Sequence, residues 1–291
     1  MFYRILSIVF PLFSVVMAGF LYARKRNPDM TAANRMNIEI FMPALIFAAL
    51  AGKSFNLADN VPIALGAAVV VAGSGLLAWP LARPLGIDTR ALMSTAMFNN
   101  VGNMGLPLML FTFGDQALGA AVVLMLILTV LQFGLSSWLL GGRFSLGAIW
   151  REPFLLAAAA GVAVSLTGVA LWPPLMAATR LLGDISLGLM IFSLGVRLAS
   201  TRVGSMLGIG VAGAIVTPVT GMLMVWVYGA LAGLNKHDMD ILFLFGALPP
   251  AVSCFIFADR YRREPEKVAA IVMIGNASAL FFIPFALALR L

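Results

Sequence analysis

The chain has 291 residues, of which 62% are hydrophobic and 11% are charged, and its mean hydropathy is +1.01. Soluble domains carry about 25% charged residues, so this composition excludes an ordinary soluble enzyme, a disordered protein and a disulfide-rich secreted domain. It predicts an all-α integral membrane protein. In such a protein the net charge of +7 marks cytoplasmic loops rather than nucleic-acid binding.

The hydropathy pattern predicts ten membrane-spanning helices, because about 20 apolar residues in helical form cross the hydrocarbon core. The first apolar stretch is followed, not preceded, by its basic cluster Arg24–Arg26. We therefore interpret it as a retained helix and not as a signal peptide. The expected spans are 3–23, 31–51, 61–82, 91–113, 116–138, 153–171, 175–199, 205–231, 239–259 and 267–290.

The basic residues are distributed unevenly over the loops that connect these spans. Fourteen of the 19 Lys and Arg residues fall in the odd-numbered loops or at their edges. Because cytoplasmic loops are enriched in Lys and Arg, this distribution predicts that both termini lie outside the plasma membrane, or the inner membrane of a bacterium. A missed span would scramble the alternation, so the count also supports ten spans.

Ten spans divide into two halves of five, and an odd number per half places the second half upside down relative to the first. We predict inverted repeats over 1–138 and 153–291, joined by a short cytoplasmic linker at 139–152. Such repeats, with broken helices at matching positions, are typical of secondary transporters. No long polar segment is available for a nucleotide-binding domain, so an ion gradient, the membrane potential or the substrate gradient would drive transport.

The fourth and ninth spans both contain residues that interrupt helices. Gly102, Gly105 and Pro107 are the expected helix breakers of the fourth span, and Pro249 and Pro250 are those of the ninth. Proline removes a backbone donor, and glycine lowers the free energy of leaving helical geometry. Two breaks at matching positions would cross near the bilayer midplane, and the downstream half-helices would present positive N-termini that suit a carboxylate.

Polar side chains near the two breaks are the candidates for substrate binding. The amides of Asn99, Asn100 and Asn103 and the hydroxyl of Ser253 could donate hydrogen bonds to an anion. Asparagines in membrane helices also join helices to one another, and this reading stays open for each. The predicted binding set is Asn99, Asn100, Asn103, Gly105, Pro107, Pro249, Pro250 and Ser253.

Three charged residues within the spans are candidates for ion or proton coupling. Glu39 could carry a proton or hold a cation, or it could pair with Arg35 one helical turn away. Arg180 and Asp184 are four residues apart in the seventh span, so we expect them to pair with each other.

Gln132 in the fifth span and Asn276 in the tenth are further candidates for ion or proton coupling; they could line the site, or could each form an interhelix hydrogen bond. The single histidine, His237, cannot build a histidine-rich metal site, and the single cysteine, Cys254, cannot form an intrachain disulfide. We therefore expect no metal and no cofactor, and the absence of catalytic motifs such as HExxH and GxSxG argues against an enzyme.

At these motifs the sequence resembles the auxin efflux carrier family, which includes plant PIN-type carriers and bacterial malate or malonate permeases. The resemblance extends over nearly the whole chain as four separated blocks, whose order and spacing together are specific. The blocks are Asn34-Arg35 with Pro43; Asn100 with Met104–Leu108; Asp184 with Phe192–Gly195; and Ala247–Pro249 with Phe255–Tyr261.

The resemblance implies a scaffold domain of spans 1, 2, 6 and 7 and a transport domain of spans 3–5 and 8–10, with spans 4 and 9 crossed. It implies that substrate binds at the crossing near Asn100, and that the chain forms a homodimer through the scaffold. Pro250 and Cys254 replace the Gln and Pro of plant members, so a small organic anion is a safer expectation than auxin itself. The related bile-acid/sodium symporters share this architecture, which keeps sodium coupling open.

We therefore expect a secondary or potential-driven transporter of a small organic anion, such as malate, malonate or an auxin-like acid, that works by alternating access. One alternative is a sodium-coupled symporter of organic anions, and another is a membrane sensor that binds a ligand without moving it. The expected partners are the organic anion, Na⁺ or H⁺, membrane lipid and a second copy of the chain.

Overall fold

The computed structural model describes residues 2–52, 55–140, 152–200 and 206–290, and these ranges contain helices and no β-strand. The predicted all-α class is therefore confirmed. The linker expected at 139–152 falls almost wholly outside the described residues.

Among the described residues, six helical stretches are long and apolar enough to cross a membrane, and they coincide with the first, third, fifth, seventh, eighth and tenth expected spans. Two of them contain short flanking turns: η2 (Ala58–Asn60) precedes α4, and η4 (Asp115–Ala117), η5 (Gln132–Ser136) and α8 (Ser137–Leu140) flank α7. The six main helices are α1 (Phe2–Arg26), α4 (Val61–Ala82), α7 (Leu118–Leu131), α10 (Pro173–Ser200), α11 (Leu207–Ala232) and α14 (Pro265–Arg290).

The other four expected spans are shorter or interrupted. The second contains the π-helical turn η1 directly before Pro43, where the wider turn accommodates a residue that lacks an N–H. The sixth is the single helix α9 (Pro153–Thr167). The remaining segments are α2 (Thr31–Met36), η1 (Asn37–Phe41) and α3 (Met42–Leu50); α5 (Thr89–Met97), η3 (Val101–Gly105) and α6 (Leu106–Phe113); and α12 (Lys236–Gly246) and α13 (Ser253–Arg260).

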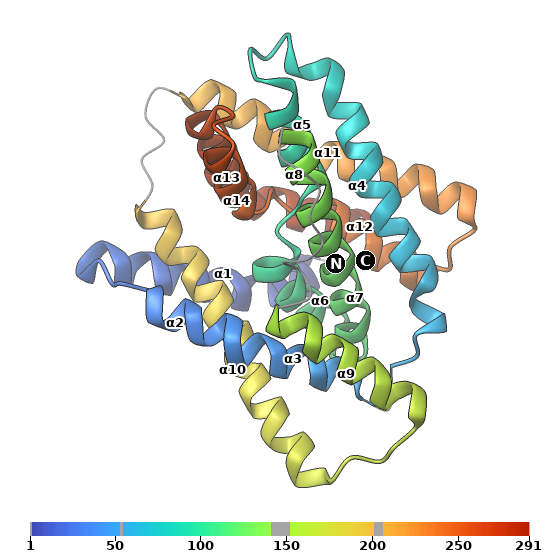
Figure 1. The fold of residues 1–291 in the computed structure, drawn as a ribbon. Coiled ribbons are helices and arrows are strands. Elements are labelled where there is room, and N and C mark those ends of the chain that lie inside the picture. The colour runs from blue at the N-terminus through green and yellow to red at the C-terminus, as the bar shows by residue number, and fades with distance from the viewer. Residues whose placement is uncertain (1, 53–54, 141–151, 201–205, 291) are drawn as a thin grey trace.

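The helices form two groups in space (Figure 1). In one group α1 packs along α10, and α3 packs against both α9 and α10. In the other, α11 contacts α4, α12 and α14, and α4 packs on α5. Helices α6 and α7 lie between the two groups in Figure 1.

Two glycines allow α1 and α10 to approach closely. A Cβ atom on Gly19 would collide with the carbonyl oxygen of Phe192, and one on Gly195 would collide with the carbonyl oxygen of Val16. Small residues at such contacts allow dispersion attraction between backbones, which drives helix association in lipid. Gly195 ends the Phe192–Gly195 block, so this motif has a packing role that sequence analysis did not identify.

Candidate functional site

The fourth and ninth expected spans are both interrupted. Helix α5 ends at Met97, and helical geometry resumes at Val101. Helix α12 ends at Gly246, and α13 begins at Ser253. Each interruption frees backbone groups that would be costly to bury without partners.

The two interruptions supply partners to each other. The N–H of Asn100 donates to the carbonyl oxygen of Pro249 over 2.7 Å, and the N–H of Ala251 donates to the carbonyl oxygen of Phe98 over 2.8 Å. The segments run antiparallel at this contact. Residues about 150 positions apart are thus joined through their backbones, with Pro249 and Pro250 inside the non-helical segment as expected.

The first break lies earlier than expected. Gly102 and Gly105 belong to the π-helical turn η3, and Pro107 stands in the first turn of α6. These three residues follow the interruption, and the wide π turn accommodates Pro107 within a continuing helix. The helix is interrupted instead at Phe98–Asn100, where the other segment provides replacement hydrogen bonds.

A chain of buried amides crosses this contact. Asn100 Nδ2 donates to Asn276 Oδ1 over 2.7 Å, and Asn276 Nδ2 donates to the carbonyl oxygens of Pro250, at 3.0 Å, and Val272, at 2.8 Å. Asn103 Nδ2 donates to Asn100 Oδ1 over 3.1 Å. Asn100 and Asn276 are each 2% exposed, whereas Asn103 is half-buried. Asn103 is therefore the most accessible of these three amides.

A second polar group lies where α13 begins. Ser253 Oγ donates to Gln132 Oε1 over 3.0 Å, and Gln132 Nε2 lies 3.8 Å from Cys254 Sγ. The Cys254 thiol in turn lies 3.5 Å from the carbonyl oxygens of both Ser94 and Phe98. The first turn of α13 is thus tied to η5 and to the end of α5.

Asn99 has a different position from the other predicted asparagines. Its Nδ2 donates to the carbonyl oxygen of Phe245 over 2.6 Å, and the residue is 5% exposed. Phe245 is in the last turn of α12, where carbonyl groups lack partners within the helix. The Asn99 amide therefore provides a hydrogen-bond donor for a carbonyl group at the end of α12.

Two helical segments begin at this contact, at Val101 and at Ser253. Their N-termini carry partial positive charge. A Cβ atom on Gly102 would meet only Met125 Sδ, at 3.9 Å, so the backbone of this first turn has open space beside it. The half-buried Ser253 begins the second segment. Backbone N–H groups, amides and a hydroxyl at this place can bind an anion.

A cavity of about 300 Å³ adjoins the amide chain. Asn276 and Met104 line it on one side, and apolar side chains of α1 and α10, including Phe13, Phe20 and Leu194, line the other. The cavity therefore lies between the two helix groups and combines an apolar wall with one amide.

Three of the predicted coupling residues lie away from this site. Glu39 is exposed and forms an ion pair with Arg35 at 2.8 Å, which was one of the two interpretations open for it. Arg180 and Asp184 are both exposed on α10. The expected pairing of Arg180 with Asp184 was wrong, since the described residues contain no ion pair between them; both face outward.

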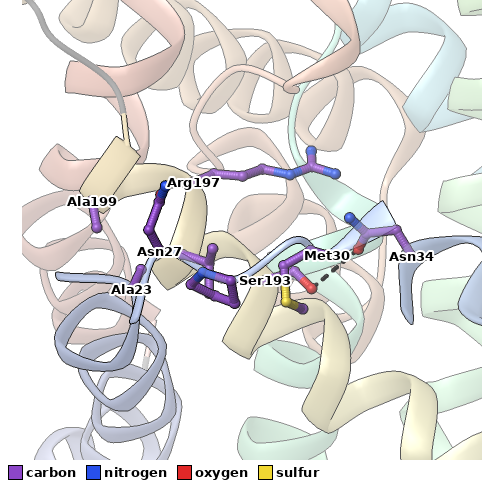
Figure 2. A pocket seen from close by; sticks show the side chains of 9 residues that line it. Ala23, Asn27, Met30, Asn34, Ser193, Arg197 and Ala199 are labelled. Atoms are coloured by element: carbon purple, nitrogen blue, oxygen red, sulfur yellow. Dashed lines mark hydrogen bonds between the residues drawn. The ribbon is translucent and has the colours of Figure 1, made fainter. Parts of the chain in front are cut away.

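A second cavity, of about 210 Å³, lies at the C-terminal ends of α1 and α10 (Figure 2). Asn27, Asn34, Ser193 and Arg197 supply its polar lining. Ser193 Oγ donates to Asn34 Oδ1 over 3.2 Å, which joins α2 to α10. Two of the sequence blocks, Asn34-Arg35 and Phe192–Gly195, therefore meet here rather than where the two interrupted segments pair.

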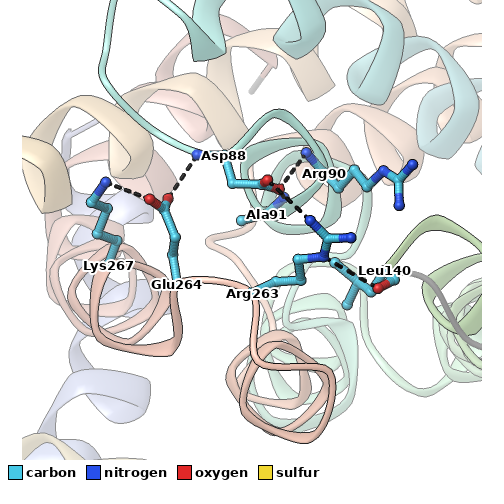
Figure 3. Close-up of polar contacts among 7 residues, drawn as sticks. All are labelled: Asp88, Arg90, Ala91, Leu140, Arg263, Glu264 and Lys267. Carbon is cyan, nitrogen blue, oxygen red and sulfur yellow. Dashed lines mark hydrogen bonds and ion pairs between the residues drawn. The ribbon is translucent and has the colours of Figure 1, made fainter.

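Sequence analysis missed an ionic cluster that joins the segment between α4 and α5 to the segment between α13 and α14 (Figure 3). The N–H of Asp88 donates to Glu264 Oε2 over 2.7 Å, and Arg263 lies 3.5 Å from the Asp88 carboxylate. Lys267 Nζ lies 2.6 Å from Glu264 and donates to the carbonyl oxygen of Gly86 over 2.7 Å. No local spacing signals the link between Asp88 and Glu264, because these residues are 176 positions apart.

A second missed cluster surrounds Asp240, which is 5% exposed. Its carboxylate lies 2.6 Å from Lys236 Nζ and accepts a hydrogen bond from Arg290 Nε over 2.7 Å. The i,i+4 spacing of Lys236 and Asp240 is the one signal that the sequence offered. This cluster fixes the start of α12 to the end of α14.

The family model described as membrane transport protein matches the chain in two overlapping segments, residues 4–141 and 137–287. No curated protein matches the chain.

Proposed function

Because the chain belongs to this family of membrane transporters, that of the auxin efflux carriers, we propose that it is a secondary transporter that moves a small organic anion by alternating access where the two interrupted segments meet. The observation that carries the proposal is the backbone pairing of Asn100 with Pro249, together with the buried Asn100–Asn276 hydrogen bond. Interrupted helices with polar groups at their contact are the usual substrate sites of such transporters.

The proposed architecture has ten spans in two inverted repeats, 1–138 and 153–291, with segments 91–113 and 239–259 crossed. Helices α1, α2, α3, α9 and α10 form the scaffold domain, and α4–α8 with α11–α14 form the transport domain. The packing of α1 on α10 and of α11 on α4 and α14 supports this division. The loop charge asymmetry supports placing both termini outside the plasma membrane.

The transport domain would move as one body, by an elevator or rocking motion. The cluster of Asp88, Arg263, Glu264 and Lys267 supports this, because it ties the first repeat to the second by one ion pair and two hydrogen bonds that involve backbone atoms. The backbone pairing at the crossing joins the repeats a second time. Movement of this body past the scaffold would expose the cavity between the two groups first to one side and then to the other.

The substrate carboxylate would bind at the N-termini that begin at Val101 and Ser253, with Asn103 as the accessible amide donor. Asn100 and Asn276 would hold that amide in position through their own hydrogen bonds. Because the adjoining cavity has mainly apolar walls, a monocarboxylate with an apolar body suits it better than a dicarboxylate such as malate, whose second charge would lack a partner there.

The protein would act as a homodimer through the scaffold. Arg180 and Asp184 support this, because both are exposed in the outward face of the 28-residue helix α10. A charge facing lipid near the centre of a span costs about 3 kcal/mol on insertion scales. In a two-fold interface the same patch meets itself, so Arg180 of each protomer would lie near Asp184 of the other and both charges would be neutralised.

The test is uptake of a labelled aromatic monocarboxylate, indole-3-acetate, and of labelled malate into proteoliposomes. We expect saturable uptake of the monocarboxylate. Asn103→Ala should reduce this uptake at least about tenfold, because it removes about one charge-assisted hydrogen bond to the carboxylate. Gln116→Ala, an exposed polar residue outside the site, is the matched control and should retain wild-type uptake.

Other outcomes of this experiment identify the alternatives. Uptake that requires sodium at a fixed membrane potential would replace the proposal with sodium-coupled symport. Tight binding of the monocarboxylate without flux would indicate a sensor. Equal uptake by wild type and Asn103→Ala would remove Asn103 from the site.

A further inference from the structure

The cavity between α1, α2 and α10 has a polar lining that the proposed transport mechanism does not use. Its volume of about 210 Å³ is several times the ~30 Å³ that one water molecule occupies in the liquid. The described residues that line it come from α1, α2 and α10 and from the segment that connects α1 to α2. A ligand here would thus not be carried by the relative movement of the two groups.

The lining residues offer hydrogen-bond donors and positive charge. Figure 2 shows the Arg197 side chain extending from α10 toward Asn34. A guanidinium has five N–H donors, so Arg197 can bind an anion while keeping other contacts. Because Asn34 Oδ1 already accepts from Ser193, Asn34 has its Nδ2 amide left to offer. None of the nine described residues that line the cavity is acidic.

The surroundings of the cavity are also basic. Helix α1 ends in Arg24, Lys25 and Arg26, all exposed, directly before Asn27. One acidic residue, Asp29, is nearby but is not part of the lining. Hydrogen bonds from Thr31 lower the pKa of Asp29, so its carboxylate is charged and directed to the start of α2.

The cavity lies where two membrane-spanning stretches end, Tyr3–Arg26 and Pro173–Ala199. The ends of such helices reach the level of the lipid headgroups. By the loop charge distribution this is the cytoplasmic side, whose leaflet carries anionic lipids that attract basic segments.

We propose that this cavity is a binding site for a phosphate group, held by Arg197 and Asn34, and that anionic phospholipid is its natural source. The guanidinium plane matches phosphate geometry in a bidentate manner. The site would fasten the scaffold to the cytoplasmic leaflet and stabilise the α1–α10 pair while the other helix group moves.

The experiment uses purified, delipidated full-length protein in a non-ionic detergent at about 0.3 M salt, where nonspecific surface attraction is screened. The probes are dioleoyl-phosphatidylglycerol, zwitterionic dioleoyl-phosphatidylcholine and inorganic phosphate, and the readout is the rise in Tm as each is titrated. We expect phosphatidylglycerol to raise Tm saturably and phosphatidylcholine to raise it much less.

Two variants test the residues. Arg197→Gln should raise the half-saturating lipid concentration at least about tenfold, because it removes one charged contact. Asn34→Asp keeps the side-chain shape and the acceptor for Ser193 but places a negative charge in the cavity, and it should weaken binding similarly. Lys25→Gln, exposed at the same end of α1 but outside the lining, is the matched control. Far-UV circular dichroism and gel filtration check that the variants fold.

A response to inorganic phosphate that depends on Arg197 would support the site and show that the phosphate group alone suffices, whereas a response to lipid only would support a headgroup site that needs the acyl chains. Equal lipid responses in wild type, Arg197→Gln and Asn34→Asp would overturn the proposal. The absence of any response to both phosphatidylglycerol and phosphate would overturn it as well.

Discussion

Asn100 and Asn276 lie 176 positions apart in the chain, and Asn100 Nδ2 donates to Asn276 Oδ1 over 2.7 Å in a fully buried environment. Asn276 Nδ2 in turn donates to the carbonyl oxygen of Pro250. One side-chain pair therefore joins α14 to both non-helical segments. This pair determines where the accessible amide of Asn103 is held.

The coupling of Asn100 with Asn276 predicts non-additive substitution effects. Asn100→Ala and Asn276→Ala should each lower the free energy of unfolding by about 1–3 kcal/mol, because each leaves a buried partner unsatisfied. The double variant should lose about 1 kcal/mol less unfolding free energy than the sum of the two single variants, since the second substitution removes the amide that the first left without a partner. Thermal unfolding in detergent measures this cycle, and strictly additive losses would contradict the coupling.

Gly275 should tolerate no side chain. A Cβ atom there would lie 2.5 Å from Cδ of Pro250, so Gly275→Ala must displace the crossing segment. We expect an uptake loss of more than about tenfold and a destabilisation of about 1–3 kcal/mol from overpacking. Gly208→Ala is the matched control, because nothing lies within 4 Å of a Cβ there. It should be neutral or slightly stabilising in its helix, and equal effects of the two would count against the prediction.

The Cys254 thiol should react slowly with a labelling reagent, because it becomes accessible only when the contact between the two interrupted segments opens. Cys254 is the single cysteine of the chain, and its exposure is 0%. Because the reactive form of cysteine is the solvated thiolate, a membrane-permeant maleimide should label it at least about a hundredfold more slowly than an exposed cysteine. Gln116→Cys in a Cys254→Ala background supplies that exposed reference, because Gln116 is exposed in the short turn between α6 and α7. Comparable labelling rates, followed by mass spectrometry, would mean that the crossing is open to solvent.

The charges on the outer face of α10 predict an effect on oligomeric state. Asp184→Ala should leave Arg180 of the partner protomer without its counter-charge and shift the protein toward monomer in detergent, by about 1–3 kcal/mol of association free energy. The exchange variant Arg180→Asp with Asp184→Arg should restore the dimer. Size-exclusion chromatography with light scattering measures the mass, and Arg83→Ala, an exposed charge directly after the end of α4, is the control. A monomeric wild-type protein would refute the interface.

Composition, hydropathy and loop charge were sufficient to predict an all-α membrane protein and the positions of its long apolar helices, because lipid requires every spanning segment to satisfy its backbone internally. The motifs around Asn100 and Pro249 also indicated the two interruptions and the family. These features depend on local residue chemistry and on neighbours along the chain.

The tertiary structure decided the features that depend on distant partners. The fourth span breaks at Phe98–Asn100 and not at Pro107, because backbone hydrogen bonds from residues 249–251 are available only at the earlier position. Asn99 satisfies the end of α12, Asn276 joins Asn100, and Glu264 meets Asp88 for the same reason. Hydrophobic periodicity places a residue on a helix, but the helix that faces it, and so the partner of each buried polar group, is settled only when the chain packs.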